Sequence, residues 1–183
     1  MLQYRLVDAG WGSFGFVVRE KRLIATSLPA PKASIRRRIS QRWPDAVEGP
    51  ALLPRFCKQV VDYFSGRHIR FAVDVDLSDL PPFFRAVLEQ CRRIPYGELA
   101  SYQDLARAAG RPTAVRAVGG AMAHNPLPLV VPCHRVVRAD GTIGGFSSPN
   151  GVAEKLRLLR LEGVDLDASP AGRCLDGRRA VVA

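Results

Sequence analysis

Hydrophobic and polar residues in the first part of the chain follow two different spacings. Short segments rich in β-branched and aromatic residues predict three strands: Gln3–Val7, Phe14–Arg19 and Leu23–Ser27. The charged stretch Arg19–Arg22 suits a turn between the last two strands. Apolar residues recur at helical spacing in Lys32–Trp43 and Leu52–Phe64, which predicts two helices. Ile69–Leu77 alternates apolar and polar residues and predicts another strand with one buried face.

Beyond Pro81 the apolar spacing becomes helical. Pro81 and Pro82 begin a helical pattern that runs to about Arg93, and Ile94–Gly97 breaks it. We therefore expect an α/β domain at residues 1–80 and a mainly helical domain at 81–165, followed by a loose tail at 166–183. The predicted fold class is α+β.

The segment Ser101–Asn125 has the pattern of two helices joined by a tight turn. Ser101 with Asp104 resembles a capping box, while Gly110 suits the end of the first helix and Pro112 the start of the second. This is the spacing of a helix-turn-helix, although packed helical hairpins share it. The pair Gly119–Gly120 needs a reason, because each glycine costs about 1 kcal/mol inside a helix. Close approach to a partner and close packing against another helix are equally open explanations.

Composition and charge narrow the possible partners. The 183 residues contain 27 Lys and Arg against 17 Asp and Glu, for a net charge of +10. Residues 81–138 hold the excess of the second half of the chain, which suits a surface that faces phosphates. A cationic face kept for solubility is the open alternative. The run Arg36–Arg38 is expected to be such a solvated face.

Cysteines and histidines are too scattered for a metal site or a disulfide framework. Cys57 and Cys91 fall within apolar helical patterns and are expected to be inert core residues. No apolar run approaches the length of a membrane span, and the first residues lack the layout of a signal peptide. We expect a cytoplasmic protein that has no membrane partner and needs no metal or cofactor.

An apolar run ending in proline delivers Cys133, with His134 and Arg135 immediately after it. The reactive form of cysteine is the thiolate, which a neighbouring base or cation favours. In an extended strand Cys133 and His134 would point to opposite faces, so contact between them requires a turn or a bridging water. On these residues alone, a buried structural cysteine is the more frequent explanation.

The sequence IPYGELASYQDLARAAGRPTAVRAVGGAMAHNPLPLVVPCHRVV, residues 94–137, closely resembles the O6-alkylguanine-DNA alkyltransferase family. The resemblance continues more loosely through Gly144–Gly163. It implies a ribonuclease-H-like α/β domain followed by a helical domain with a helix-turn-helix. It also implies irreversible transfer of an alkyl group from O6-alkylguanine in flipped-out DNA to a cysteine, with O4-alkylthymine as a further candidate substrate.

The resemblance carries catalytic roles over to five positions of this sequence. Cys133 would accept the alkyl group, His134 would activate it through a water, and Glu162 would orient that histidine. Tyr102 would help to rotate the nucleotide and would donate a proton to guanine. Asn125 would support the turn before the cysteine.

Two further sets of residues are implied by the same resemblance. The expected DNA-binding residues, of which the first would fill the space of the extruded base, are Arg116, Tyr102, Gln103, Arg111, Gly119, Gly120 and Ala121. The expected walls of the base pocket are Met122, Val136, Phe146, Ser147 and Lys155. The implied partner is double-stranded DNA with an alkylated guanine, bound through the minor groove by a monomer.

The chain departs from the family pattern at the pocket rim. Phe146 stands where many relatives have Tyr, and Ser147–Gly151 replaces a glycine-rich loop. A stiffer rim is expected to narrow the range of alkyl groups accepted. Of the rival functions, a non-reacting damage sensor would carry Trp in place of Cys133. A helix-turn-helix regulator would not need the PCHR element, and a cysteine hydrolase would need an oxyanion hole and turnover.

Overall fold

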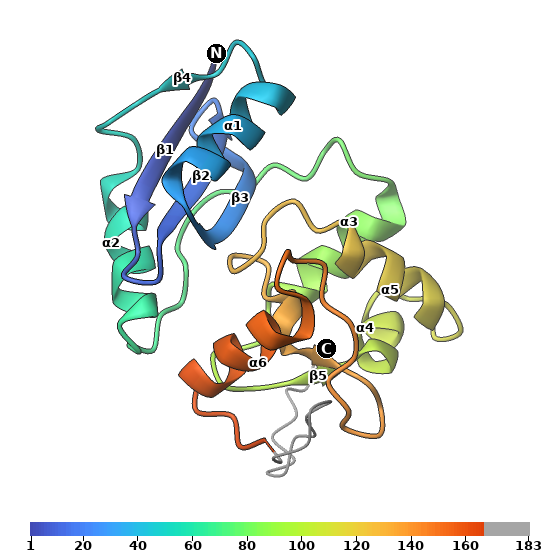
Figure 1. Ribbon diagram of the computed structural model, residues 1–183. Coiled ribbons are helices and arrows are strands. Elements are labelled where there is room, and N and C mark those ends of the chain that lie inside the picture. Colours follow the sequence, from blue (N-terminus) through green and yellow to red (C-terminus); the bar gives the residue numbers. More distant parts are fainter. Residues whose placement is uncertain (167–183) are drawn as a thin grey trace. The chain divides into compact units, whose positions relative to one another are not determined.

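The computed structural model describes residues 1–166 and divides into two compact units (Figure 1). The first unit comprises Met1–Asp79 with Pro126–Val130, and the second comprises Leu80–Asn125 with the chain from Val131 on. A mixed sheet with helices forms the first unit and helices dominate the second, so the predicted α+β class is confirmed. The loose tail expected at 166–183 lies, from residue 167 on, outside the described residues.

Four strands form the sheet of the first unit, in the order β3-β2-β1-β4. The three predicted strands are present as β1 (Leu2–Asp8), β2 (Ser13–Arg19) and β3 (Arg22–Ala30), which pair antiparallel. The short strand β4 (Val47–Glu48) pairs parallel to β1. The pattern of the sequence did not predict β4, because two residues are too few to show an alternation.

A helix covers each face of this sheet. Ile35 and Ile39 of α1 (Lys32–Arg42) pack with Val17 of β2, and a Cβ at Gly15 would lie 2.5 Å from Ile35 Cγ2. On the other face, Phe56 of α2 (Pro54–Phe64) packs edge-on against Phe14 and Phe16. Successive residues of a strand point to opposite faces, so each helix meets its own set of side chains.

The strand predicted at Ile69–Leu77 is not formed. Only Val75 makes an isolated bridge, with Leu23 of β3. The Gln59 side chain satisfies part of this segment's backbone, donating to the carbonyl of Arg70 at 3.0 Å and accepting from the N–H of Ala72 at 3.2 Å. Apolar and polar residues alternate here because the chain is extended and half-buried. It does not form a continuous row of strand hydrogen bonds with a neighbouring strand.

The second unit contains four helices and one small parallel sheet within the described residues. Its elements in chain order are α3 (Pro82–Cys91), β5 (Ala100–Ser101), α4 (Tyr102–Ala108), α5 (Val115–Ala123), the 3₁₀ turn η1 (Cys133–Arg135), β6 (Val136–Val137) and α6 (Gly151–Leu161). Strands β5 and β6 pair with each other. None of the helices within residues 1–166 has the length and apolar character needed to cross a membrane.

The residues predicted to begin and end the first helix of the pair are confirmed, whereas the second helix begins later than predicted. Ser101 caps α4 through a reciprocal capping box with Asp104, and Gly110 follows the helix at a φ of +74°. The second helix begins at Val115, three residues after Pro112, because Arg111–Ala114 forms a turn closed by a 2.9 Å hydrogen bond.

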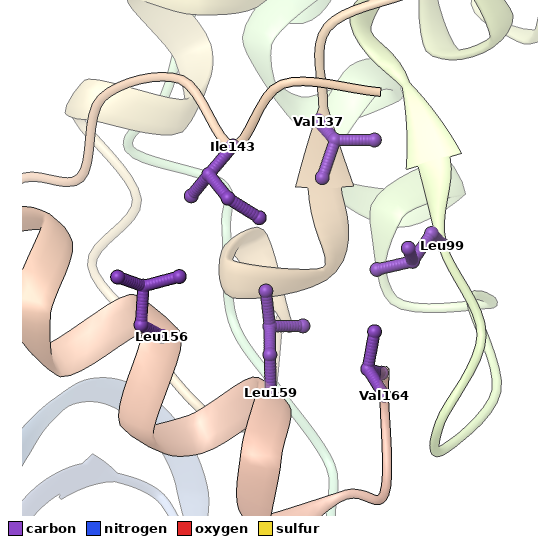
Figure 2. Packing of buried hydrophobic residues seen from close by; sticks show 6 residues of the cluster. All are labelled: Leu99, Val137, Ile143, Leu156, Leu159 and Val164. Carbon is purple, nitrogen blue, oxygen red and sulfur yellow. The ribbon is translucent and has the colours of Figure 1, made fainter. Parts of the chain in front are cut away.

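A compact apolar core fixes α6 against the β5–β6 sheet (Figure 2). Leu156 and Leu159 of α6 meet Val137 of β6 and Ile143 of the following loop. Leu99 and Val164 close the cluster, and all six side chains are buried. This core places the buried residues on α6 and at its end beside η1.

The hairpin between β2 and β3 offers a test of stability. Glu20 and Lys21 lie between the paired residues Arg19 and Arg22 and have positive φ angles of 51° and 65°. Such two-residue turns favour Asn-Gly, because a side chain costs energy at positive φ. We expect Glu20→Asn with Lys21→Gly to stabilise the protein by about 1 kcal/mol, measured by urea unfolding.

Glu20→Asn with Lys21→Ala is the matched control. It removes the same charges but keeps a Cβ at the second turn position, so we expect no comparable gain. Equal stabilisation of the two variants would assign the effect to charge and contradict the conformational explanation.

Candidate active site

A turn, rather than an extended strand, presents Cys133. The N–H of Cys133 donates to the carbonyl of Val131 at 2.8 Å, and the N–H of Arg135 donates to that of Pro132 at 2.9 Å. Cys133 and His134 therefore share the 3₁₀ turn η1 instead of alternating along an extended strand. Cys133 is 8% exposed and borders a pocket of about 180 Å³.

The pocket is built from one residue of α4, one side of α5 and the loop after Ile143. Its lining residues are Tyr102, Gly119, Met122, Ala123, Cys133, Gly145, Phe146 and Ser147. Gly144 allows the loop to approach Tyr102, because a Cβ there would lie 3.3 Å from the phenol oxygen. The structure thus brings together the expected residues Tyr102, Met122, Phe146 and Ser147 around Cys133.

Lys155 and Val136, also expected in the pocket wall, are not among the described residues that line it. Both side chains are fully buried, and Lys155 Nζ donates to the carbonyls of Val136 and Ile143 at 2.5 and 2.6 Å. These two carbonyls flank the turn that Arg138 and Thr142 close with a 2.9 Å hydrogen bond. Lys155 therefore fixes the two ends of the segment that leads into the pocket loop.

The Cys133 sulfur has two neighbours that favour its anionic form. Asn125 Nδ2 donates to Sγ at 3.2 Å and to the carbonyl of Val131 at 2.9 Å, so it holds both the thiol and the turn. Burial nevertheless raises the pKa of the Cys133 thiol above its usual value, and the Asn125 hydrogen bond and the positive charge of Lys155 only partly offset this effect.

Behind Cys133, His134 contacts a buried ion pair. His134 Nε2 lies 2.8 Å from Glu162 Oε1, and Arg135 donates to the same carboxylate through Nε at 2.8 Å and Nη2 at 2.9 Å. Burial opposes ionisation of Glu162, but the contacts with His134 and Arg135 outweigh it and hold the pKa of Glu162 well below its usual range. Burial lowers the pKa of His134, which favours a neutral imidazole.

Tyr102 is suited to donate rather than to accept a proton. Burial and the proximity of Cys133 raise the pKa of its phenol above the usual value. The phenol oxygen lies against Gly144 at the pocket wall. The hydroxyl therefore keeps its proton at neutral pH, in a residue that lines the pocket beside Cys133.

The exposed side of α5 continues from the pocket to Arg116. Arg116, Gly119 and Ala123 are spaced i, i+3 and i+7, so they lie on one helix face, and the last two line the pocket. Arg116 is exposed. Nothing described lies within 4 Å of a Cβ built at Gly119, whereas one at Gly120 would lie 3.3 Å from Phe84 of α3. Gly119 thus lies on the pocket side of α5, and Gly120 allows α5 to pack closely against α3.

Ala121 requires a correction as a DNA-binding candidate. Its side chain is fully buried, on the face of α5 that also carries Val118 and Met122. The helical spacing of 3.6 residues turns the side chain of position 121 toward the interior, away from the surface that a partner could contact.

Gln103 and Arg111 connect the turn after α4 to neighbouring helices, Gln103 to α4 and Arg111 to α3. Gln103 Nε2 donates to the carbonyl of Pro112 at 2.7 Å, and the Arg111 guanidinium lies 5.2 Å from the centre of the Phe83 ring. Arg111 is exposed, while Gln103 is half-buried. Both residues therefore hold the turn, and Arg111 also contributes positive charge to the surface.

Three residues of the site were not expected from the sequence. Ala123 and Gly145 line the pocket, and Arg135 binds Glu162. The helical spacing from Gly119 could have indicated Ala123, but nothing in the sequence pairs Arg135 with a carboxylate 27 residues away. Within residues 1–166, no three His, Cys, Asp or Glu side chains gather as metal ligands would.

Comparison with known proteins places the chain among relatives of one family. Residues 82–164 match the family described as 6-O-methylguanine DNA methyltransferase, DNA binding domain. A methylated-DNA–protein-cysteine methyltransferase of Mycolicibacterium paratuberculosis is 35% identical over 166 residues, covering 88% of this chain and 93% of that protein. The bifunctional transcriptional activator/DNA repair enzyme Ada of Escherichia coli is 36% identical over 163 residues, but the chain spans only 45% of its length.

A solved structure is similar along nearly the whole chain. The Mycobacterium tuberculosis protein OGT in complex with DNA superposes with a TM-score of 0.74 at 31% identity, covering 87% of this chain and 92% of that one. The sequence relatives and the shared fold together show that the chain belongs to the O6-methylguanine-DNA methyltransferase family.

Proposed function

We propose that this protein repairs DNA by transferring an alkyl group from O6 of guanine to Cys133. The observation that carries the proposal is the position of Cys133 at a pocket, held by Asn125 and followed by the buried His134–Glu162–Arg135 group. The family members that match this chain along most of their length are named methylated-DNA–protein-cysteine methyltransferases.

The reaction is a displacement at the alkyl carbon. A bond forms between Cys133 Sγ and that carbon while the bond from the carbon to guanine O6 breaks. The thiol proton passes to His134 through a water, and the Tyr102 phenol protonates the departing guanine. The His134 imidazolium then returns a proton to the Tyr102 phenolate through water, so the net transfer is of one proton from sulfur to guanine.

Access to the alkylated base requires its extrusion from the duplex. A base inside the stack cannot reach an enclosed sulfur, and flipping costs a few kcal/mol. Arg116 lies on the pocket face of α5 and is exposed, so it can occupy the space that the base leaves. Gly119 leaves that face without side-chain bulk, which suits a helix lying in the minor groove.

The product explains why each molecule acts once. The thioether on Cys133 has no bond that water readily breaks, so the nucleophile is not regenerated. A protein that only senses damage is disfavoured by Cys133 itself, because a sensor needs no nucleophile beside a base and a proton donor.

The first prediction for the proposed function concerns which residue receives the methyl group and how many methyl groups each protein molecule accepts. Incubation with duplex DNA carrying one radiolabelled O6-methylguanine should label the Cys133 peptide at a plateau of about one methyl per protein, because the thioether is stable. Peptide mass mapping locates the label. Cys133→Ala should still bind DNA but transfer nothing, and label on another peptide or continued turnover would contradict the mechanism.

The second prediction separates base flipping from chemistry. Arg116→Ala should slow repair of the duplex by about tenfold or more, equivalent to at least 1.4 kcal/mol in the transition state. It should leave transfer from the free base O6-benzylguanine unchanged, since no flipping is needed. Arg160→Ala, at an exposed position of α6, removes the same charge as a control and should affect neither reaction.

The third prediction concerns the electrostatic role of Lys155. Lys155→Met removes the positive charge that lowers the pKa of Cys133, so alkylation of the thiol by iodoacetamide should need a higher pH. It also leaves two buried carbonyls without their donor, at a cost of about 1–3 kcal/mol each in unfolding measurements. If the substitution only exposed the Cys133 thiol to water, the pKa of the thiol would fall and alkylation would proceed at a lower pH. Lys58→Met, at an exposed position, is the control.

A further inference from the structure

The turn Ile94–Gly97 has no part in the transfer described above, yet three of its residues contact the groups behind His134. The turn follows α3, and the N–H of Glu98 donates to the carbonyl of Pro95 at 3.2 Å. Gly97 is the third residue of the four-residue turn from Pro95 to Glu98 and has a φ of +73°, which glycine adopts without strain.

Two contacts join this turn to the end of α6. The N–H of Gly97 donates to Glu162 Oε2 at 3.1 Å, and the Tyr96 hydroxyl donates to the carbonyl of Leu161 at 3.0 Å. The two backbones are so close that a Cβ at Gly97 would lie 3.0 Å from the carbonyl oxygen of Glu162. The turn therefore fixes both the carboxylate of Glu162 and the backbone that carries it.

The same turn also holds Arg135. Arg135 Nη1 donates to the carbonyl of Ile94 at 2.6 Å, and the guanidinium carbon lies 5.8 Å from the centre of the Tyr96 ring. Nε and Nη2 of the same guanidinium bind the two oxygens of Glu162. One turn thus positions the carboxylate and the cation that neutralises it.

We propose that the Ile94–Gly97 turn, acting with Arg135, is a positioning element that keeps His134 neutral and oriented as the base for Cys133. This proposal rests on the proposed function. An ionised carboxylate only accepts hydrogen bonds, so His134 presents Nε2–H to Glu162 and keeps Nδ1 as its basic nitrogen. Because Arg135 and Gly97 supply the other donors, Glu162 stays ionised without a second proton on the imidazole.

The charges around His134 determine in which direction its pKa moves when the contacts of Glu162 with Arg135 and Gly97 are weakened. The groups that face it are Glu162 and Lys155 of the α6 region and Cys133 and Arg135 of η1. Burial lowers the pKa of His134, Glu162 raises it, and Arg135 and Lys155 lower it. A carboxylate that loses Arg135 and Gly97 as partners binds the imidazolium more strongly, so the pKa of His134 rises and the neutral base is lost at a higher pH.

Gly97→Ala in the full chain tests the proposal. The added Cβ opposes the positive φ and pushes against the carbonyl of Glu162. We expect the acid limb of the rate of methyl transfer from duplex DNA to move up by about one pH unit, a tenfold loss of rate on that limb. The NMR titration of the His134 ring should shift in the same direction, independently of any transfer.

Gly10→Ala is a matched control for backbone strain. Gly10 has the same φ of +73°, and nothing described lies within 4 Å of its Cβ position. We expect it to lower Tm while leaving the pH profile and the His134 titration unchanged. Tyr96→Phe, which loses the Leu161 contact but keeps the ring beside Arg135, should give a smaller shift of the same sign and remains informative if Gly97→Ala does not fold.

The outcomes separate this inference from the proposed function. If the wild type transfers methyl to Cys133 but both turn variants keep its pH profile and its His134 titration, the positioning role is wrong and the function stands. If the wild type transfers nothing, the proposed function fails, while the His134 titration still decides whether the turn sets its protonation.

Discussion

A single buried carboxylate, that of Glu162, is the group on which the site depends. Its side chain is fully excluded from water, where an ion is stable only if its oxygens receive hydrogen bonds and its charge is balanced. Arg135 supplies two donors, and His134 and Gly97 supply one each. These donors come from η1 and from the turn before β5, so one ion joins three segments that are distant in sequence. The apolar core that packs α6 against β6 fixes the helix whose C-terminal end carries this carboxylate.

Much of the fold could be predicted wherever one face of an element is strongly apolar. Strands β1 to β3 and helices α1 to α5 show such patterns, and the residues that begin and end α4 are typical of helix caps. Ile69–Leu77 misled because a half-buried extended chain shows the same alternation as a paired strand. Helix α6 was not predicted, although Val152, Leu156 and Leu159 repeat at helical spacing and pack in one apolar cluster. Two-residue strands such as β5 carry no pattern at all.

The site could be predicted only in part from residue types. Apolar spacing indicates where Cys133 is buried but not that η1 turns there, so the cysteine remained open until the resemblance to the family was considered. Small residues such as Ala121 do not reveal which way they face. Arg135 stands next to the proposed base, yet its partner comes from the end of α6, and long-range pairing of charges has no local signature. Lys155 was expected in the pocket wall, but its contacts are with two backbone carbonyls and it is not among the described residues that line the pocket.

The wide separation of these partners has a consequence for folding. Glu162 bonds with residues that precede it by 27, 28 and 65 positions, so no local stretch of chain can assemble the group. Contacts of this kind form late, because the entropy of closing long loops must be met first. A nascent or partly unfolded chain therefore carries Cys133 as an ordinary thiol without its base. The proposed pairing of Cys133 with its base is therefore acquired only together with the native topology, at the stage at which the protein can also bind DNA.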